Sequence, residues 1–342
     1  MAEGSRTHLS YESMKQIVKF SKMDQRERLV LCVPALKRIE SQFPYDFKEI
    51  VYASHMFEFK TNELSRSWHI ECFRPGPEDG SRDDELDPEM LTSSVIHFNT
   101  SGYRFEHSID KKYSLVLAEL MKEYLRKGPR IEKLVVHHSV PKELQDADLK
   151  LKVSRLLLDR PRKETIDTWF PLIDTDNHPL KTIEFVVDSD LLFMFEKPAL
   201  QSCEKLVLQF PYYEEIELDP LLLNIANKKL DIIKLSFPMD MMEKLIRKWL
   251  NYRRPVGTSF CLGVQEYIEV IWFFDMAKNK FKAVPSKFPD IKDATCHCVV
   301  IPIDEQMELV VFGEYREKKW PPFVWNFRME IMKPGRTVPK KF

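Results

Sequence analysis

The chain has 342 residues, of which 44% are hydrophobic and 31% are charged, as is typical of a folded globular protein rather than a disordered one. Its 52 basic and 53 acidic residues leave a net charge of −1, without the basic excess that usually accompanies binding to a nucleic-acid backbone. No apolar run reaches the roughly 18 residues of a membrane span. We therefore expect neither a nucleic acid nor a membrane as a partner.

Residues 8 to 41 are predicted to form three short helices. Apolar residues recur at helical spacing up to Phe20, a polar turn follows at residues 22 to 25, and a second apolar run covers residues 26 to 33. Pro34 interrupts the leucine-rich stretch LVLCVPALKRIE, and a proline inside a helix costs roughly 3 kcal/mol. We expect Pro34 to begin the third helix, where its fixed φ is tolerated, and Asp24 to cap the second.

Short strands are predicted from about residue 43, in the segments FKEIVYA, MFEFKT and WHIECF, with the last two forming a hairpin. Residues 75 to 89 follow, and they are rich in proline, glycine and acidic residues and too polar to bury. We expect a solvated surface loop there. An acidic surface that attracts a basic partner is the alternative.

Beyond residue 110, strand-like and helix-like segments alternate, which indicates a repeat architecture. Five segments resemble one another: IEKLVVHH, VSRLLLD, KTIEFVV, CEKLVLQF and DIIKLSF. Their aligned apolar positions are Leu134, Leu156, Phe185, Leu206 and Leu235. One strand and one helix cannot bury a core alone, so such units stack, with parallel strands side by side and helices in an outer layer. We expect a degenerate leucine-rich-repeat-like β/α solenoid.

Residues from 257 onwards are predicted to form strands, in the segments GTSFCLGV, ATCHCVVIPI, MELVVFGEY and PFVWNFRMEIM. The last segment alternates between apolar and mostly polar residues, which is the period of a strand with one buried face. These strands would cap the end of the stack. The predicted fold class is therefore α/β (α+β overall), with a helical segment at residues 8–42 and a repeat domain at residues 43–342.

The sequence predicts no enzyme, cofactor or metal site. Cys296, His297 and Cys298 carry metal-compatible side chains, but adjacent residues of a strand point to opposite faces, and no second ligand pair completes a site. His137 and His138 share this limitation. A hydrolase or metal centre would be reconsidered only if the fold gathered His137, Cys296 and a carboxylate within a few ångströms.

Other polar residues have simple structural interpretations. Arg253 and Arg254 follow a predicted helix, where they would complement its dipole and its last carbonyls. The six cysteines are scattered among apolar neighbours, a pattern typical of reduced, buried thiols in the cytoplasm or nucleus rather than of a disulfide framework.

The N-terminal segment resembles an F-box, a bundle of three short helices that binds a Skp-type adaptor. The residues that carry the resemblance are Leu9, Ser10, Tyr11, Met14, Ile17, Leu29, Leu31, Cys32, Pro34, Leu36 and Ile39. From about residue 8 to 336, the order and spacing of LSYESMKQIV, CVPALKRIESQFP, IPIDEQMELVVFGEY and WNFRMEIMKPG are similar to the nematode F-box C family.

This resemblance implies a substrate-recognition subunit of a Skp–cullin–F-box ubiquitin ligase. Its partners would be a Skp-type adaptor, through it a cullin, and a target protein bound by the repeat domain. The adaptor-binding residues implied are Leu9, Tyr11, Met14, Ile17, Leu29, Leu31, Pro34 and Leu36. The alternative is a stand-alone protein-binding repeat protein, in which the N-terminal helices form a buried cap.

Overall fold

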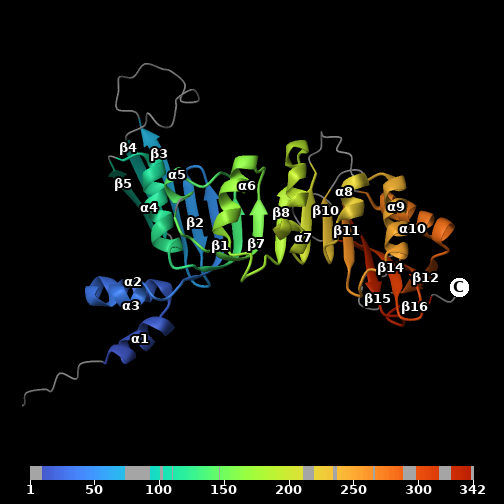
Figure 1. Cartoon of the computed structure of the whole chain (residues 1–342), viewed down its shortest axis with the longest axis horizontal. Helices are drawn as coiled ribbons and strands as arrows, with labels where there is room; N and C mark the ends of the chain where they lie inside the picture. Colours follow the sequence, from blue (N-terminus) through green and yellow to red (C-terminus); the bar gives the residue numbers. More distant parts are fainter. Residues whose placement is uncertain are drawn as a thin grey trace, which may run out of the picture. The chain divides into compact units, whose positions relative to one another are not determined.

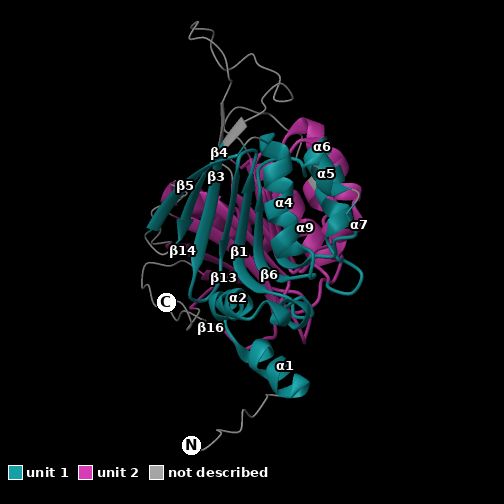
Figure 2. Ribbon diagram, turned by 90° about the vertical axis from the view of Figure 1, so that its left-hand side faces the viewer, with its two compact units in different colours: residues 1–154, 164–178 teal, residues 155–163, 179–342 magenta. Residues whose placement is uncertain are grey.

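The computed structural model describes residues 10–73, 93–100, 103–109, 111–145, 147–210, 219–233, 237–264, 266–287, 298–315 and 325–339 (Figure 1). The acidic segment 75–89, Leu9, Leu235, Cys296 and His297 lie outside these residues. The chain divides into two compact units, which Figure 2 colours separately. Unit 1 comprises residues 1–154 and 164–178, and unit 2 comprises residues 155–163 and 179–342. The expected mixed α/β fold with N-terminal helices is confirmed.

Unit 1 begins with the predicted helices. They are α1 (Tyr11–Phe20), α2 (Met23–Cys32), the 3-10 turn η1 (Pro34–Leu36) and α3 (Lys37–Glu40). Pro34 opens the third helical segment, as expected. The expected cap of α2 was wrong: Lys22 is its N-cap, and Asp24 lies in the first turn. The helix begins earlier because Gln25 reaches back and accepts a hydrogen bond from the Lys22 N–H at 3.1 Å.

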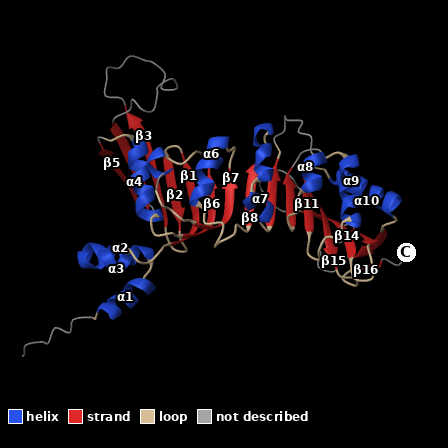
Figure 3. Ribbon diagram, viewed as in Figure 1, coloured by secondary structure: helices blue, strands red, loops and turns tan. Residues whose placement is uncertain are grey.

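The remainder of unit 1 is built around a sheet. Its strands are β1 (Asp46–Ala53), β2 (Met56–Lys60), β3 (Ser65–Phe73), β4 (Ser93–Thr100), β5 (Tyr103–Ile109) and β6 (Arg130–Val136). Strands β1 to β5 form an antiparallel succession, including the expected β2–β3 hairpin, and β6 pairs with β1 in parallel. Helix α4 (Tyr113–Leu125) lies on one face of the sheet (Figure 3). The ring of its Tyr124 packs against Phe57, Phe59 and Trp68. Two short helices, α5 (Lys142–Gln145) and α6 (Lys163–Trp169), and the turn η4 (Phe170–Leu172) follow.

Unit 2 contains a run of parallel strands. They are β7 (Lys152–Leu158), which crosses the boundary between the units, β8 (Thr182–Val186), β9 (Lys205–Gln209), β10 (Lys229–Ile233) and β11 (Ser259–Val264). The intervening helical segments are η5 (Ser189–Glu196), α7 (Pro198–Ser202), α8 (Asp219–Asn224) and α9 (Met239–Asn251). The strands therefore alternate with helical segments, in the order that the sequence predicts.

The register of these strands differs from the predicted alignment. The structure places Leu156, Ile183, Leu206, Leu230 and Phe260 side by side, all of them buried. Phe185 instead lies opposite Leu158 and Leu208. Because strand side chains repeat with a period of two, a shift of two residues keeps the same face buried, and the apolar pattern cannot distinguish the two registers.

The C-terminal part of unit 2 contains a helix that the sequence reading did not predict. Helix α10 (Tyr267–Phe281) precedes β12 (Val284–Lys287), β13 (Cys298–Pro302), β14 (Glu308–Tyr315), β15 (Trp325–Met332) and β16 (Val338–Pro339). The residues IEVIWFF favour a strand by composition, yet Val270, Phe273, Phe274 and Ala277 recur at helical spacing and are buried. The strands pair antiparallel in the order β16-β12-β13-β14-β15-β11.

Candidate functional site

The N-terminal bundle has a small apolar core of its own. Val18, Leu36 and Ile39 are buried at its centre, and the partly buried side chains packed around them are Met14, Leu29, Val30 and Phe43. Leu36, predicted to contact an adaptor, is therefore a core residue of the bundle. Its burial follows from its position at the end of η1, which contacts α2, and directly before α3, which contacts α1.

Several apolar side chains of the bundle are instead directed to solvent. Leu31 is 81% exposed and Phe20 is 78% exposed. The other exposed apolar residues of this segment are Tyr11, Ile17, Cys32, Val33, Pro34 and Ala35. Ile17 and Phe20 lie three residues apart on α1 and so share one face of the helix. The bundle thus keeps a folded core while presenting large apolar groups to its surroundings.

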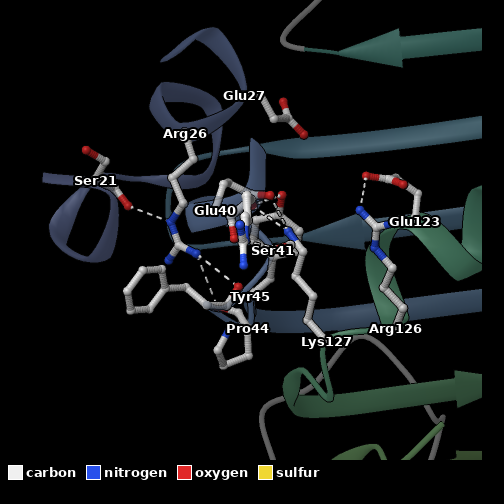
Figure 4. Close-up of polar contacts among 12 residues, drawn as sticks. Ser21, Arg26, Glu27, Glu40, Ser41, Pro44, Tyr45, Glu123, Arg126 and Lys127 are labelled. Atoms are coloured by element: carbon white, nitrogen blue, oxygen red, sulfur yellow. Dashed lines mark hydrogen bonds and ion pairs between the residues drawn. The ribbon is translucent and has the colours of Figure 1, made fainter. Parts of the chain in front are cut away.

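A buried ion pair attaches the bundle to the rest of unit 1 (Figure 4). The Nζ of Lys127 lies 2.5 Å and 2.6 Å from the two carboxylate oxygens of Glu40, and the Tyr45 hydroxyl donates to Glu40 at 2.7 Å. Burial lowers the pKa of Lys127, although the Glu40 carboxylate partly opposes this effect. Burial and the adjacent Glu40 raise the pKa of Tyr45 above its ordinary value.

A second attachment joins α2 to strand β3. Arg66 binds the two carboxylate oxygens of Glu27 at 2.8 Å and 2.6 Å. Burial opposes the charge of Arg66, but the Glu27 carboxylate more than compensates, so the pKa of Arg66 is raised. Burial also raises the pKa of Tyr124, which lies near this pair, to about 12. These two contacts, one on β3 and one after α4, both attach the bundle to the rest of unit 1.

The segment between the bundle and β1 is fixed by Arg26 of α2. Its guanidinium donates to the carbonyl oxygens of Ser21 at 3.1 Å, Phe43 at 3.4 Å and Pro44 at 3.3 Å, and it lies over the ring of Tyr45. Sequence reasoning did not find Arg26, Glu27 or Glu40. Charged residues on short helices are common, and the sequence carries no signal that pairs them with groups far along the chain.

The two adjacent histidines considered as catalytic or metal-binding residues lie directly after a strand. His137 and His138 follow the end of β6, and the His138 carbonyl accepts a hydrogen bond from the Trp169 indole at 2.9 Å. Cys298 is buried in strand β13. Within the described ranges, no three His, Cys, Asp or Glu residues lie close enough together to hold a metal ion. In that part of the chain, no helix is long and apolar enough to span a membrane.

The hydrogen bond that Arg254 makes differs from the predicted contact with the last carbonyls of α9. Its guanidinium donates to the Ile225 carbonyl and lies over the ring of Trp249 at 5.1 Å. The carbonyl that accepts this hydrogen bond belongs to the residue after α8, whereas the prediction was a carbonyl in the last turn of α9. The chain turns back after α9 and brings Arg254 beside the end of α8. Arg253 instead approaches Asp304 at 3.6 Å.

Comparison with known proteins gives one likeness. Residues 113–266, from α4 to the residue before α10, match a family described as "Domain of unknown function (DUF3557)". The match includes β6 to β11 and does not include the N-terminal bundle. No curated protein and no solved structure matches the chain.

Proposed function

We propose that this protein is the substrate-recognition subunit of a Skp–cullin–F-box type ubiquitin ligase. In this proposal the N-terminal bundle binds a Skp-type adaptor and, through it, a cullin, while the remainder of the chain binds a target protein in the cytoplasm or nucleus. The observation that carries the proposal is the bundle itself, which combines a closed apolar core with exposed Leu31 and Phe20.

Exposed apolar groups of this size favour an interface. Each large side chain removed from water contributes roughly 1.5–3 kcal/mol, so a chain gains from covering such residues with a partner. If the helices served only as a buried cap, the same residues would be covered by the chain itself. Leu31 and Phe20 are instead open, which favours the adaptor interpretation over the cap.

The proposed contact residues can be refined by their burial. Tyr11, Ile17, Leu31 and Pro34 are exposed and are assigned to the adaptor interface. Met14, Leu29 and Leu36 pack in the bundle core and are assigned to its support. Phe20 and Val33 join the interface, since both are exposed beside predicted contact residues.

The leucine-rich-repeat-like character of the parallel strands is part of the proposal. Supporting it, the buried row Leu156, Ile183, Leu206, Leu230 and Phe260 repeats once per strand. The opposite face carries paired charges, with Arg155 bound to Glu184 and Lys205 bound to Asp231, each at 2.5 Å. Such a polar face suits a protein target. The chain would contribute proximity, holding the target's lysines near a ubiquitin-conjugating enzyme.

The test is co-expression and pull-down with Skp-type adaptors, comparing the wild type with Leu31→Asp. A carboxylate at the centre of an apolar interface should reduce binding at least about 100-fold. Leu115→Asp is the matched control, since Leu115 is also a helical leucine of unit 1 with 40% exposure. It should bind as well as the wild type.

Two results would contradict the proposal. A folded wild-type protein that binds no adaptor would favour a stand-alone binding protein. Equal loss of binding in Leu31→Asp and Leu115→Asp would indicate a general effect of added charge rather than an interface at the bundle.

A further inference from the structure

Strand β5 forms an open edge of the unit 1 sheet, visible at the margin in Figure 2. It pairs with β4 along its full length, and no strand of the described chain pairs with its other side. Residues 103 to 108 are all exposed. An edge strand presents unpaired N–H and C=O groups to any second strand that can lie beside it, and natural edges are usually short, bulged or covered.

An aromatic row crosses the sheet and ends on this edge. Phe57, Trp68, Phe98 and Phe105 occupy directly opposite positions on β2, β3, β4 and β5. Their successive ring centroids are 5.8, 5.1 and 6.1 Å apart, with interplanar angles of 23°, 27° and 24°. The last ring, Phe105, is 56% exposed. The row therefore stops at the point where a further aromatic ring on a neighbouring strand would continue it.

The other face of β5 carries one positive and one negative charge. Arg104 and Glu106 both approach His97 of β4, with Arg104 Nη2 3.0 Å and Glu106 Oε2 3.5 Å from its Nδ1. Their side chains lie two residues apart on the same face, on either side of Phe105. If a second copy of this strand ran antiparallel beside it with the two Phe105 residues opposite each other, each Arg104 would therefore face a Glu106.

We propose that two copies of this chain pair through β5, as antiparallel strands related by a two-fold axis at Phe105. In this register each Arg104 lies opposite Glu106 of the second copy, and Tyr103 lies opposite His107. The two Phe105 rings meet at the axis and join the two aromatic rows. Both the charges and the aromatic residues then form favourable cross-strand pairs.

The neighbouring registers are unfavourable. A two-fold axis perpendicular to the sheet keeps each side chain on its own face, so the pairing of the two strands can shift only by two residues at a time. A shift of two residues in the pairing moves the axis by one residue, to Arg104 or to Glu106. An axis at Arg104 places the two arginines opposite each other, and an axis at Glu106 does the same for the two glutamates. Like charges directly opposite destabilise a strand pair. The charge pattern thus selects the register centred on Phe105 and identifies a second copy as the occupant.

The experiment is sedimentation velocity of the full chain up to about 100 μM, a concentration that detects even weak dimers. The wild type should dimerise, and Arg104→Glu or Glu106→Arg alone should weaken dimerisation at least about 10-fold. Mixing these two variants should restore dimers, because every charge then meets its opposite. The double variant Arg104→Glu/Glu106→Arg should also dimerise by itself.

Three outcomes would overturn the proposal. They are a wild type that stays monomeric, a dimer unaffected by either single reversal, and single variants that fail to recover on mixing while circular dichroism shows them folded. If the true partner of β5 were a strand of another protein, the wild-type chain by itself would stay monomeric, which is the first of these outcomes. The proposal is independent of adaptor binding, since Leu31→Asp should leave the dimer intact and Arg104→Glu should leave adaptor binding intact.

Discussion

Lys127 lies against the carboxylate of Glu40 in a site where the two side chains are only 3% and 7% exposed. The contact joins residues far apart in the sequence, from α3 of the bundle and the turn after α4. Tyr45 completes the site with its hydroxyl on Glu40 and its ring 4.3 Å from the lysine nitrogen. Removing one charge from such a pair leaves the other buried without compensation.

We therefore expect Lys127→Met to destabilise unit 1 by about 3–5 kcal/mol, because the Glu40 carboxylate would stay buried without its cation. Glu40→Gln combined with Lys127→Met should be less destabilising than the sum of the two single changes. Urea unfolding of the four proteins measures this coupling. The neighbouring variant Arg126→Met is the control, since its ion pair with Glu123 is exposed and should contribute little. Additive losses would show that the pair is not coupled.

A second prediction concerns acid stability and Glu49 of β1. Its carboxylate accepts from Lys133 at 2.6 Å and from Lys60 at 2.9 Å, which holds the pKa of Glu49 below its ordinary value of 4.5 despite partial burial. A carboxylate whose pKa is lower in the folded state than in the unfolded state stabilises the fold at pH values above its unfolded-state pKa. This contribution is lost as the pH falls through the folded-state pKa. Glu49→Gln should cost about 1 kcal/mol near pH 7.

The difference in unfolding free energy between wild type and Glu49→Gln should then shrink as the pH falls below 4.5. Chemical denaturation at a series of pH values measures it. Glu58→Gln, which removes a carboxylate bound to Lys60 alone, is the comparison and should have a smaller effect. A difference that stays constant from neutral to acidic pH would contradict the prediction.

Asn227 provides a test of the links between successive parallel strands. Its buried side-chain amide donates to the carbonyl oxygens of Leu200 and Cys203, each at 2.8 Å. Asn227→Ala would leave both acceptors without this donor, and we expect a loss of about 2–3 kcal/mol in thermal or urea unfolding. Asn224→Ala, at an exposed position of the preceding helix, should change stability by less than about 0.5 kcal/mol. Similar losses in both variants would disprove the assignment.

Thiol reactivity should distinguish Cys32 from the buried cysteines. Burial raises the pKa of Cys203 and of Cys261 to about 11, so few of their thiols are ionised at neutral pH. Cys32 is instead exposed beside Leu31, so the prediction of a buried thiol was wrong at this position. Brief alkylation of the native protein, followed by peptide mass spectrometry, should modify Cys32 well before Cys203 or Cys261. All three should react in denaturant. Equal native rates would contradict the burial of Cys203 and Cys261.

The local helices of the bundle could be predicted because Pro34 and the apolar spacing are short-range signals. The parallel strands of unit 2 could also be predicted, since their apolar runs are regular. Helix α10 was missed because its aromatic and β-branched residues favour a strand locally, while its burial against the strands depends on tertiary contacts. The attachments of Lys127 and Arg66 could not be predicted, because each joins groups that only the folded chain brings together.

Gly313 of β14 determines how closely α10 can approach the sheet. A methyl group at this position would lie 2.8 Å from Val270 Cγ1 and 3.6 Å from the Phe274 ring. Helix α10 also contacts β11, β13 and β15, so it cannot retreat from one strand without parting from the others. The lack of a Cβ atom at this one glycine therefore sets the distance between α10 and the C-terminal strands. We expect the helix and these strands to fold and unfold together in a single cooperative step.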